Sequence, residues 1–251
     1  MDPIAYQQTI AVENDHWWYR GRRLIVNTTI RRLGLPSMAQ VLDAGCGSGR
    51  NMVELARLGT AFGAELDPAS AEIATNRNVG EIVQCGVESM PFASEKFDLI
   101  TCLDVIEHVK VDSEAFRELL RVAKPGGFLV VTVPAYQWLW SHHDVVNQHY
   151  RRYTHARLKT VALSEGWECV RTGYFNSIML PLAAIVRLSE RVRPKNPDHG
   201  LDLDLPPKMV NGLLELPLKV ENFLIRLGIR LPAGVSVVAV FRRPETVPGR
   251  N

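Results

Sequence analysis

The sequence predicts an α/β fold in which a mostly parallel β-sheet is covered by helices on both faces. Short apolar runs alternate with helical patterns along most of the chain, as expected of consecutive βαβ units. A glycine-rich turn at 45–49 follows the first of these runs directly. The 251 residues are 46% hydrophobic and 22% charged, which suits one large globular domain with some elaboration.

The alternation can be followed element by element from residue 39. Seven strands are expected, over 40–45, 61–66, 81–85, 97–105, 128–134, 167–175 and 235–244. Helices are expected over 51–59, closed by Gly59, and over 68–78, 113–123 and 156–166. The Lys-Pro-Gly-Gly run at 124–127 should end the third of these helices.

Two segments do not fit the alternation, so we divide the single domain into four parts. These are an N-terminal segment (1–38), the core (39–175), a helical cap inserted before the last strand (176–232), and the last strand with its tail (233–251). The cap holds an apolar helix, a polar loop over 193–207 and a second helix that Pro217 should kink. The second helix has apolar residues near helical period at Val210, Leu213, Leu214, Val220, Leu224 and Leu227. They could form the core of the cap, enclose an apolar acceptor or touch a membrane.

Charge and cysteine content restrict the class of protein. A net charge of +2 without a basic stripe argues against a nucleic-acid partner. The 4 cysteines form no CxxC pair, which indicates reduced thiols in a cytoplasmic protein. The first residues lack the apolar core of a signal peptide, and the run 178–186 is shorter than the roughly 20 residues of a spanning helix.

The turn VLDAGCGSGR, 41–50, predicts a ligand site. Its glycines let a ligand approach the backbone without a Cβ in the way, and the following helix points free N–H groups toward it. A dinucleotide site has the spacing G-x-G-x-x-G, whereas this turn has G-x-G-x-G with Asp43 two residues ahead. A carboxylate would repel a pyrophosphate but attract the sulfonium and ammonium of S-adenosylmethionine. An NAD-dependent dehydrogenase is therefore disfavoured.

VLDAGCGSGR also resembles motif I of the class I S-adenosylmethionine-dependent methyltransferases. AFGAELDP, IVQCGVESMPF, FDLITCLDVIEHV and KPGGFLVVTVP resemble later parts of that family in the same order, so the resemblance extends to residue 175. It implies a doubly wound, Rossmann-like, seven-stranded sheet. It also implies S-adenosylmethionine as the cofactor and S-adenosylhomocysteine as the product.

The resemblance also implies cofactor contacts. Glu65 would bind both ribose hydroxyls and Leu66 would lie against the adenine. Many family members have an Asp that binds the adenine where this chain has Gly86. The resemblance therefore implies adenine contacts only for the next two residues, Val87 and Glu88, through their backbone atoms. The full set expected is Tyr19, Arg20, Asp43, Gly45, Cys46, Gly47, Gly49, Glu65, Leu66, Val87, Glu88 and Leu103.

The N-terminal run HWWYRGRR, 16–23, looks like the opening of one bacterial subgroup of these enzymes. In related folds such a segment closes as a lid over cofactor and substrate. Trp17 and Trp18 could either pack the lid on the sheet or offer an aromatic face to the sulfonium. An arginine of the run, with Arg20 preferred, could pair with the carboxylate of the cofactor.

Methyl transfer needs a positioned acceptor and, often, a base, and two clusters could supply it. The first is Asp104, Glu107 and His108. Some relatives acting on quinone precursors use a Glu-His pair here as metal ligands, but neighbours diverge on a regular helix and only a turn would bring them together. We therefore expect no metal site. The other interpretation of His108 is a backbone hydrogen bond that shapes the loop.

The second cluster, 134–154, is the densest aromatic and imidazole region of the chain. It follows the fifth strand, where class I enzymes build their acceptor pocket. His149 is the first candidate for the base and His143 the second, with His108 and Tyr153 as further catalytic candidates. Arg151 or Arg152 could hold an anionic acceptor. The alternative for each residue is a rigid loop pinned by aromatics and arginines.

The sequence thus predicts a methyltransferase acting on a small apolar or aromatic molecule, at oxygen, nitrogen or carbon. The alternatives are a module that binds S-adenosylmethionine without transfer, and transfer to a lipid-linked acceptor through the cap. An amino-base methyltransferase is disfavoured because LDVI stands where N-P-P-Y would be expected. The acceptor, a coupled step such as cyclisation, and the oligomeric state stay open at this stage.

Overall fold

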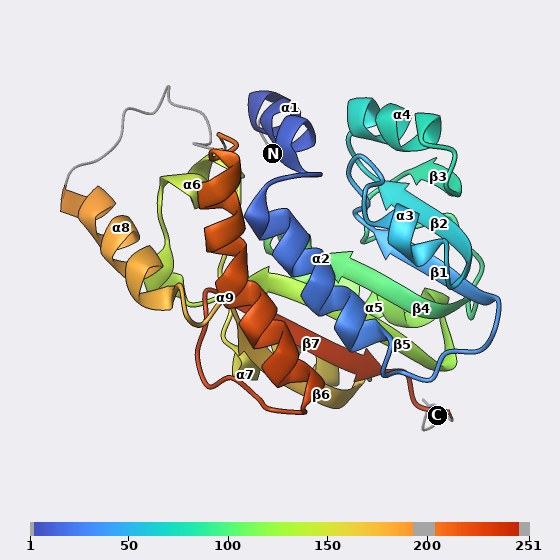
Figure 1. The fold of residues 1–251 in the computed structure, drawn as a ribbon. Coiled ribbons are helices and arrows are strands. Elements are labelled where there is room, and N and C mark those ends of the chain that lie inside the picture. The colour runs from blue at the N-terminus through green and yellow to red at the C-terminus, as the bar shows by residue number, and fades with distance from the viewer. Residues whose placement is uncertain (1–2, 193–203, 246–251) are drawn as a thin grey trace.

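The computed structural model describes residues 3–192 and 204–245 and contains a seven-stranded sheet (Figure 1). The strands are β1 (Ala39–Ala44), β2 (Gly59–Glu65), β3 (Glu81–Gln84), β4 (Phe97–Leu103), β5 (Ala123–Pro134), β6 (Glu168–Phe175) and β7 (Ser236–Arg242). Their order across the sheet is β3-β2-β1-β4-β5-β7-β6. The predicted α/β class, the seven strands and the mostly parallel sheet are confirmed.

The strand order reverses beside β1, and this positions the site. β1 pairs in parallel with β2 on one side and with β4 on the other, and only β7 runs antiparallel to its neighbours in the sheet. The connections from β1 and β4 therefore leave in opposite directions and open a crevice at the carboxyl ends of these strands. In open α/β sheets ligands bind at such a point.

Helices cover both faces of the sheet. They are α1 (Pro3–Val12), α2 (Trp17–Ile30), α3 (Met52–Leu55), α4 (Pro68–Asn76), α5 (Asp112–Val122), α6 (His142–Val146), α7 (His155–Ser164), α8 (Leu180–Val192) and α9 (Lys208–Arg226), with short 3₁₀ turns η1 (Ile106–His108) and η2 (Gln137–Leu139). Successive side chains of a strand point to opposite faces of the sheet, so each strand contributes apolar residues to both helix layers. Leu42 and Ile100 pack on the face covered by α5 and α7, whereas Val41 and Leu99 pack with Val26 of α2 on the other.

Two predicted boundaries were wrong. The helix expected over 51–59 is only α3, because Gly59 already belongs to β2 and pairs with Ala39 of β1. α5 ends at Val122, before the Lys-Pro-Gly-Gly run, as predicted. The strand expected from 128 begins earlier, at Ala123, so the run lies inside β5, where the register with β4 shifts between Phe97 and Leu99. A bulge accommodates the glycines there without ending the strand.

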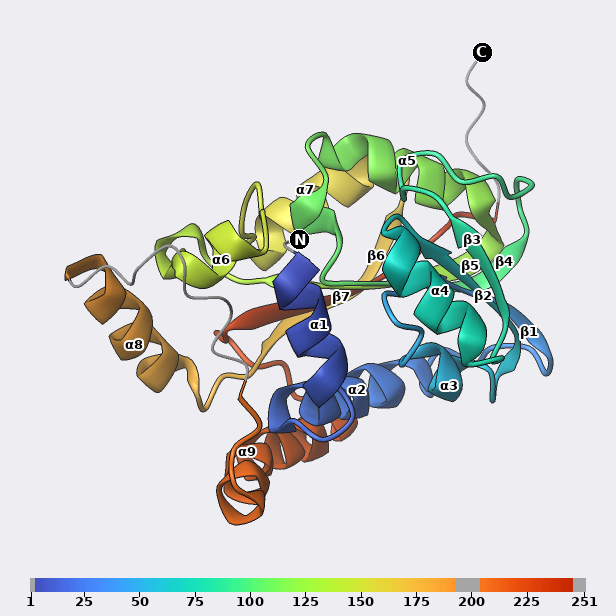
Figure 2. The ribbon, with the colours of Figure 1, turned by 90° about the horizontal axis from the view of Figure 1, so that it is seen from above.

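The N-terminal helices lie above the sheet, with α1 over the crevice when the molecule is seen from above (Figure 2). The Trp18 ring stacks on Phe175 at a centroid distance of 5.7 Å, and the backbone N–H of Trp17 donates to Asn211 of α9 at 2.8 Å. Of the two interpretations of these tryptophans, packing against the sheet and the cap is therefore the one that their contacts support.

The cap helices α8 and α9 lie between β6 and β7 in the chain, as predicted. Pro217 lies inside α9. The expected loop lies mostly outside the described residues, at 193–203, as does the tail at 246–251. Four of the six apolar residues expected to form a core of the cap do not do so, since Val210 is 47% exposed and Leu213, Val220 and Leu227 are at least half exposed. No helix of the described residues is long and apolar enough to cross a membrane.

Candidate active site

The glycine turn after β1 leaves an open space at the crevice. Gly45 and Gly47 both have positive φ, 79° and 55°. A Cβ on Gly45 would lie 2.3 Å from the Val105 side chain, so this glycine permits close packing. A Cβ on Gly47 would meet no atom of the described residues within 4 Å. The backbone at Gly47 is therefore free to contact a ligand.

Glu65, at the end of β2, is held in place by the turn. Its carboxylate is buried and accepts hydrogen bonds from the backbone N–H of Gly47 at 2.7 Å and of Asp67 at 2.9 Å. Leu66 follows it and is 69% exposed at the mouth of the crevice. The residues predicted to contact the ribose and the adenine, Glu65 and Leu66, are therefore neighbours beside the glycine turn. A bound nucleoside would require this arrangement.

Asp43 is buried at the end of β1 with one carboxylate oxygen unused. The Thr101 hydroxyl donates to its Oδ1 at 2.7 Å, whereas its Oδ2 has no hydrogen-bond partner among the described residues. Burial raises the pKa of Asp43 to about 7, which the hydrogen bond from Thr101 only partly offsets. A buried, unsatisfied carboxylate oxygen is costly unless a ligand completes it, and a cation would do so.

The other predicted cofactor residues surround this space unevenly. Cys46, Val87 and Leu103 are buried, and Glu88 is exposed. Gly49 has positive φ at 78°, and its Cβ would press on Ala74 of α4. Gly49 therefore permits close packing against α4, whereas Gly47 keeps the open side of the turn free of a side chain.

The loop between α1 and α2 is fastened to the glycine turn, which the sequence did not indicate. Glu13 accepts a 2.7 Å hydrogen bond from the Ser48 hydroxyl and forms an ion pair with Arg77. Arg50 donates to the Asn14 side chain at 2.7 Å. These contacts seat the N-terminal segment directly over motif I.

Among the basic residues of α2, Arg22 rather than Arg20 reaches the crevice. Arg22 forms an ion pair with Asp104 at the end of β4. Arg20 instead pairs with Glu215 of α9 at 3.3 Å. Tyr19 donates its hydroxyl to Thr9 at 3.3 Å. Asp104 itself has a φ of 57°, an unusual conformation that often marks a functional site.

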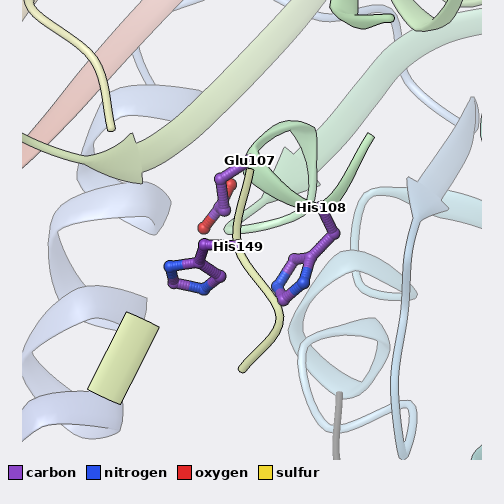
Figure 3. Close-up of side chains that lie close together, drawn as sticks. All are labelled: Glu107, His108 and His149. Atoms are coloured by element: carbon purple, nitrogen blue, oxygen red, sulfur yellow. The ribbon is translucent and has the colours of Figure 1, made fainter. Parts of the chain in front are cut away.

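Glu107, His108 and His149 come together beside Asp104 (Figure 3). One ligand atom from each lies within 4.8 Å of the other two. η1 is the turn that brings the sequence neighbours to one side, and the N–H of Tyr150 donates to the carbonyl of Glu107 at 2.8 Å, which fixes the partner segment. We predicted no metal site because adjacent residues diverge on a regular helix. Glu107 and His108 instead lie in a 3₁₀ turn, so the reason for that prediction does not hold.

Asp144 orients His149. It accepts a 2.8 Å hydrogen bond from the Nδ1–H of His149 and two further bonds from Arg152, at 2.8 and 2.9 Å. A carboxylate paired with arginine is an acceptor, so the proton of the neutral ring is on Nδ1 and Nε2 carries a free lone pair. In Figure 3 the Glu107 carboxylate points toward His149.

Burial sets the charges of Glu107 and His108. Both carboxylate oxygens of Glu107 are buried without a hydrogen-bond partner among the described residues. Burial, and then the charge of Asp104, hold the pKa of Glu107 well above its usual range. Burial and the neighbouring His149 lower the pKa of His108 to about 3. At neutral pH the cluster can therefore carry a neutral His108 beside a neutral Glu107, or it can hold one divalent cation.

The remaining catalytic candidates lie further out. His143 is exposed, and its ring centroid is 6.4 Å from that of His149. Tyr153 is fully buried and donates its hydroxyl to Asp112 at 2.9 Å, so the structure does not bring it into the cluster. Arg151 donates to the carbonyl of Val109 at 2.8 Å, and Arg152 is committed to Asp144. Both arginines thus stabilise the segment after β5 through these hydrogen bonds.

The comparisons with known proteins agree with this geometry. Residues 42–131 match the family described as "Methyltransferase domain". The matched residues form a methyltransferase domain, which supports the resemblance to the class I S-adenosylmethionine-dependent enzymes. It is 33% identical over 130 residues to the ubiquinone biosynthesis O-methyltransferase of Pseudomonas fluorescens, covering 44% of this chain and 54% of that protein. The chain spans about half the length of the curated relatives it matches.

Solved structures support the methyltransferase fold over more of the chain. A complex of the Haloferax volcanii Trm112 methyltransferase activator with a methyltransferase matches with a TM-score of 0.62 and 17% identity, over 96% of this chain and 95% of that one. Haemonchus contortus phosphoethanolamine N-methyltransferase 2 in complex with S-adenosylmethionine matches with a TM-score of 0.58 and 17% identity, over 87% and 52%. At this identity the likeness concerns the fold alone.

Proposed function

We propose that this protein transfers the methyl group of S-adenosylmethionine to a small apolar or aromatic acceptor. The observation that carries the proposal is the unfilled position at Gly47, flanked by the orphaned oxygen of Asp43 and the fixed carboxylate of Glu65. These groups fit the cofactor, since a cation would satisfy Asp43 and a ribose would meet Glu65. The domain match over 42–131 supports the same cofactor.

The chain contributes binding, orientation and proton removal. Asp43 would attract the positive end of the cofactor, Glu65 would accept from the ribose hydroxyls, and Leu66 would cover the base. When bound, S-adenosylmethionine supplies the methyl group and keeps the electron pair of the broken S–C bond on sulfur as S-adenosylhomocysteine. The acceptor forms the new bond to this methyl group and loses its proton to Nε2 of His149, which Asp144 has oriented.

The acceptor class follows from the surroundings of the cluster and from the relatives. Tyr136 stacks on Trp138 at 5.7 Å and on Tyr174 at 5.1 Å, which places aromatic rings after β5. The named relative is an O-methyltransferase of ubiquinone biosynthesis. A phenolic hydroxyl is therefore the acceptor to test first, and the N-terminal segment would act as a lid over it.

The test is formation of S-adenosylhomocysteine by the full chain with a panel of catechols. We expect acceptor-dependent product, and we expect His149→Gln to lower kcat by about 10²–10⁴ without changing the Kd for S-adenosylmethionine. His143→Gln, a neighbouring and exposed imidazole, is the matched control and should keep its kcat. Loss of turnover in His143→Gln alone would move the base to that residue.

Because His149 needs a free Nε2, metal ions should compete with it. We expect EDTA to leave turnover unchanged and Zn²⁺ to inhibit by occupying Glu107, His108 and His149, with recovery when EDTA is added. If EDTA abolished turnover and a divalent cation restored it, these three residues would form a cofactor site and His149 would not be the base.

A further inference from the structure

The outer side of α9 carries an apolar stripe that the proposed methyl transfer does not use. It consists of Met209, Leu213, Leu216, Val220, Phe223 and Leu227, which are 50 to 89% exposed. Their spacing alternates between four and three residues, so they lie in one row along the helix. A contiguous exposed row of large apolar residues marks an interaction surface.

The inner side of α9 makes both apolar and polar contacts. Leu218 and Ile225 pack in a buried cluster with Ile25 of α2. Asn211 accepts from the N–H of Trp17, and Glu215 pairs with Arg20. Glu221 is fully buried and accepts two backbone N–H bonds from Ser177 and Ile178. In Figure 2 α9 lies beside α2 at the edge of the molecule, and the six stripe residues are at least half exposed. None of them belongs to the buried cluster, so packing within the described residues does not account for the stripe.

The charges beside the stripe have one sign. Between 208 and 230, where every residue is described, both acidic residues are buried. The basic residues of the same stretch, Lys208, Lys219, Arg226 and Arg230, are exposed. Lys219 stays exposed even though it pairs with Glu215 at 3.2 Å. An exposed apolar row with basic flanks is complementary to an anionic lipid surface.

We propose that α9 docks the protein on the surface of an anionic membrane, with the apolar stripe in the interface and the basic residues at the headgroups. A second copy of α9 fits less well. A coiled coil would place Lys219 and Arg226 at flanking positions with no exposed acid opposite them, and Pro217 interrupts the middle of the seam. This inference does not depend on the proposed chemistry.

The test is flotation of the full chain with phosphatidylcholine vesicles that contain or lack phosphatidylglycerol. We expect binding only to the anionic vesicles and release by salt. The double variant Leu216→Glu with Phe223→Glu should lower the bound fraction by roughly tenfold or more. Leu163→Glu, at an exposed apolar position of α7, is the matched control and should bind as the unaltered chain does.

A second variant tests the charges without altering the stripe. Lys208→Gln with Arg226→Gln should weaken binding to anionic vesicles while melting temperature and affinity for S-adenosylmethionine stay unchanged. Absence of vesicle binding by the unaltered chain would overturn the proposal. A dimer in light scattering that the Leu216→Glu, Phe223→Glu variant dissociates, without vesicle binding, would overturn it in favour of a helix partner. Equal binding by that variant would also overturn it.

Discussion

Asp43 is the residue whose ionisation should control cofactor affinity. Its pKa is raised to about 7 in the free protein, mainly by burial. A cationic cofactor favours the ionised form, so below pH 7 binding must release a proton from this group. We expect the affinity for S-adenosylmethionine to rise about tenfold per pH unit up to about pH 7 and to level off above it.

Calorimetric titrations between pH 5.5 and 8.5 check this prediction, with Asp43→Asn as the matched control that removes the titration. The free protein gives a second readout. Because the pKa of Asp43 in the folded protein lies above its ordinary value of 3.8, the free energy of unfolding should fall as the pH rises from about 4 to about 7. A pH-independent affinity in the unaltered chain would contradict the role given to Asp43.

At the scale of elements, the turn after β1 has two glycines with different tasks. Ala at either position meets a similar strain from positive φ, of about 1–2 kcal/mol. Gly45→Ala also drives its Cβ into Val105 and should cost about 1–3 kcal/mol more in stability. Gly47→Ala projects into open space, so it should fold well but bind S-adenosylmethionine poorly. Denaturant unfolding and calorimetry of both variants separate the two effects, and equal losses of stability would contradict this division.

The sequence predicted elements where local pattern and packing agree. The strand and helix alternation placed all seven strands, and the glycine spacing predicted the turn after β1, where Gly45, Gly47 and Gly49 have positive φ. It failed where a non-local pairing decided the outcome. Gly59 looks like a helix stop, but pairing with Ala39 makes it part of β2. η1 could not be foreseen from adjacent Glu107 and His108, because the contact that fixes this turn comes from Tyr150.

At the scale of the whole molecule, long-range contacts hold the N-terminal segment over the site. Glu13 and Ser48 are 35 residues apart, and no sequence pattern joins them. The orientation of α9 was missed for a related reason, since the polar residues on its inner side are fixed by partners on α2 such as Arg20. Helical period alone shows that a helix has two sides, but not which one the fold covers.

Closure of the N-terminal segment over the cofactor should therefore depend on Glu13. Glu13→Ala removes the acceptor for Ser48 and the ion-pair partner of Arg77. We expect a Kd for S-adenosylmethionine that is about three- to tenfold higher, corresponding to the roughly 0.5–1.5 kcal/mol of one hydrogen bond. Hydrogen exchange over 7–30 should also become faster. Glu165→Ala, which removes a surface partner of Arg117, is the control, and the same response in both variants would contradict a specific latch.

The central claim is that the crevice beside Gly47 binds S-adenosylmethionine. Calorimetric titration of the full chain with S-adenosylmethionine, S-adenosylhomocysteine and NADH, without and with EDTA, tests it most directly. The account predicts saturable binding of the first two ligands alone, independent of EDTA, and a loss of about 1–3 kcal/mol of binding free energy in Glu65→Ala. Binding of NADH alone, or an unchanged Kd in Glu65→Ala, would contradict it.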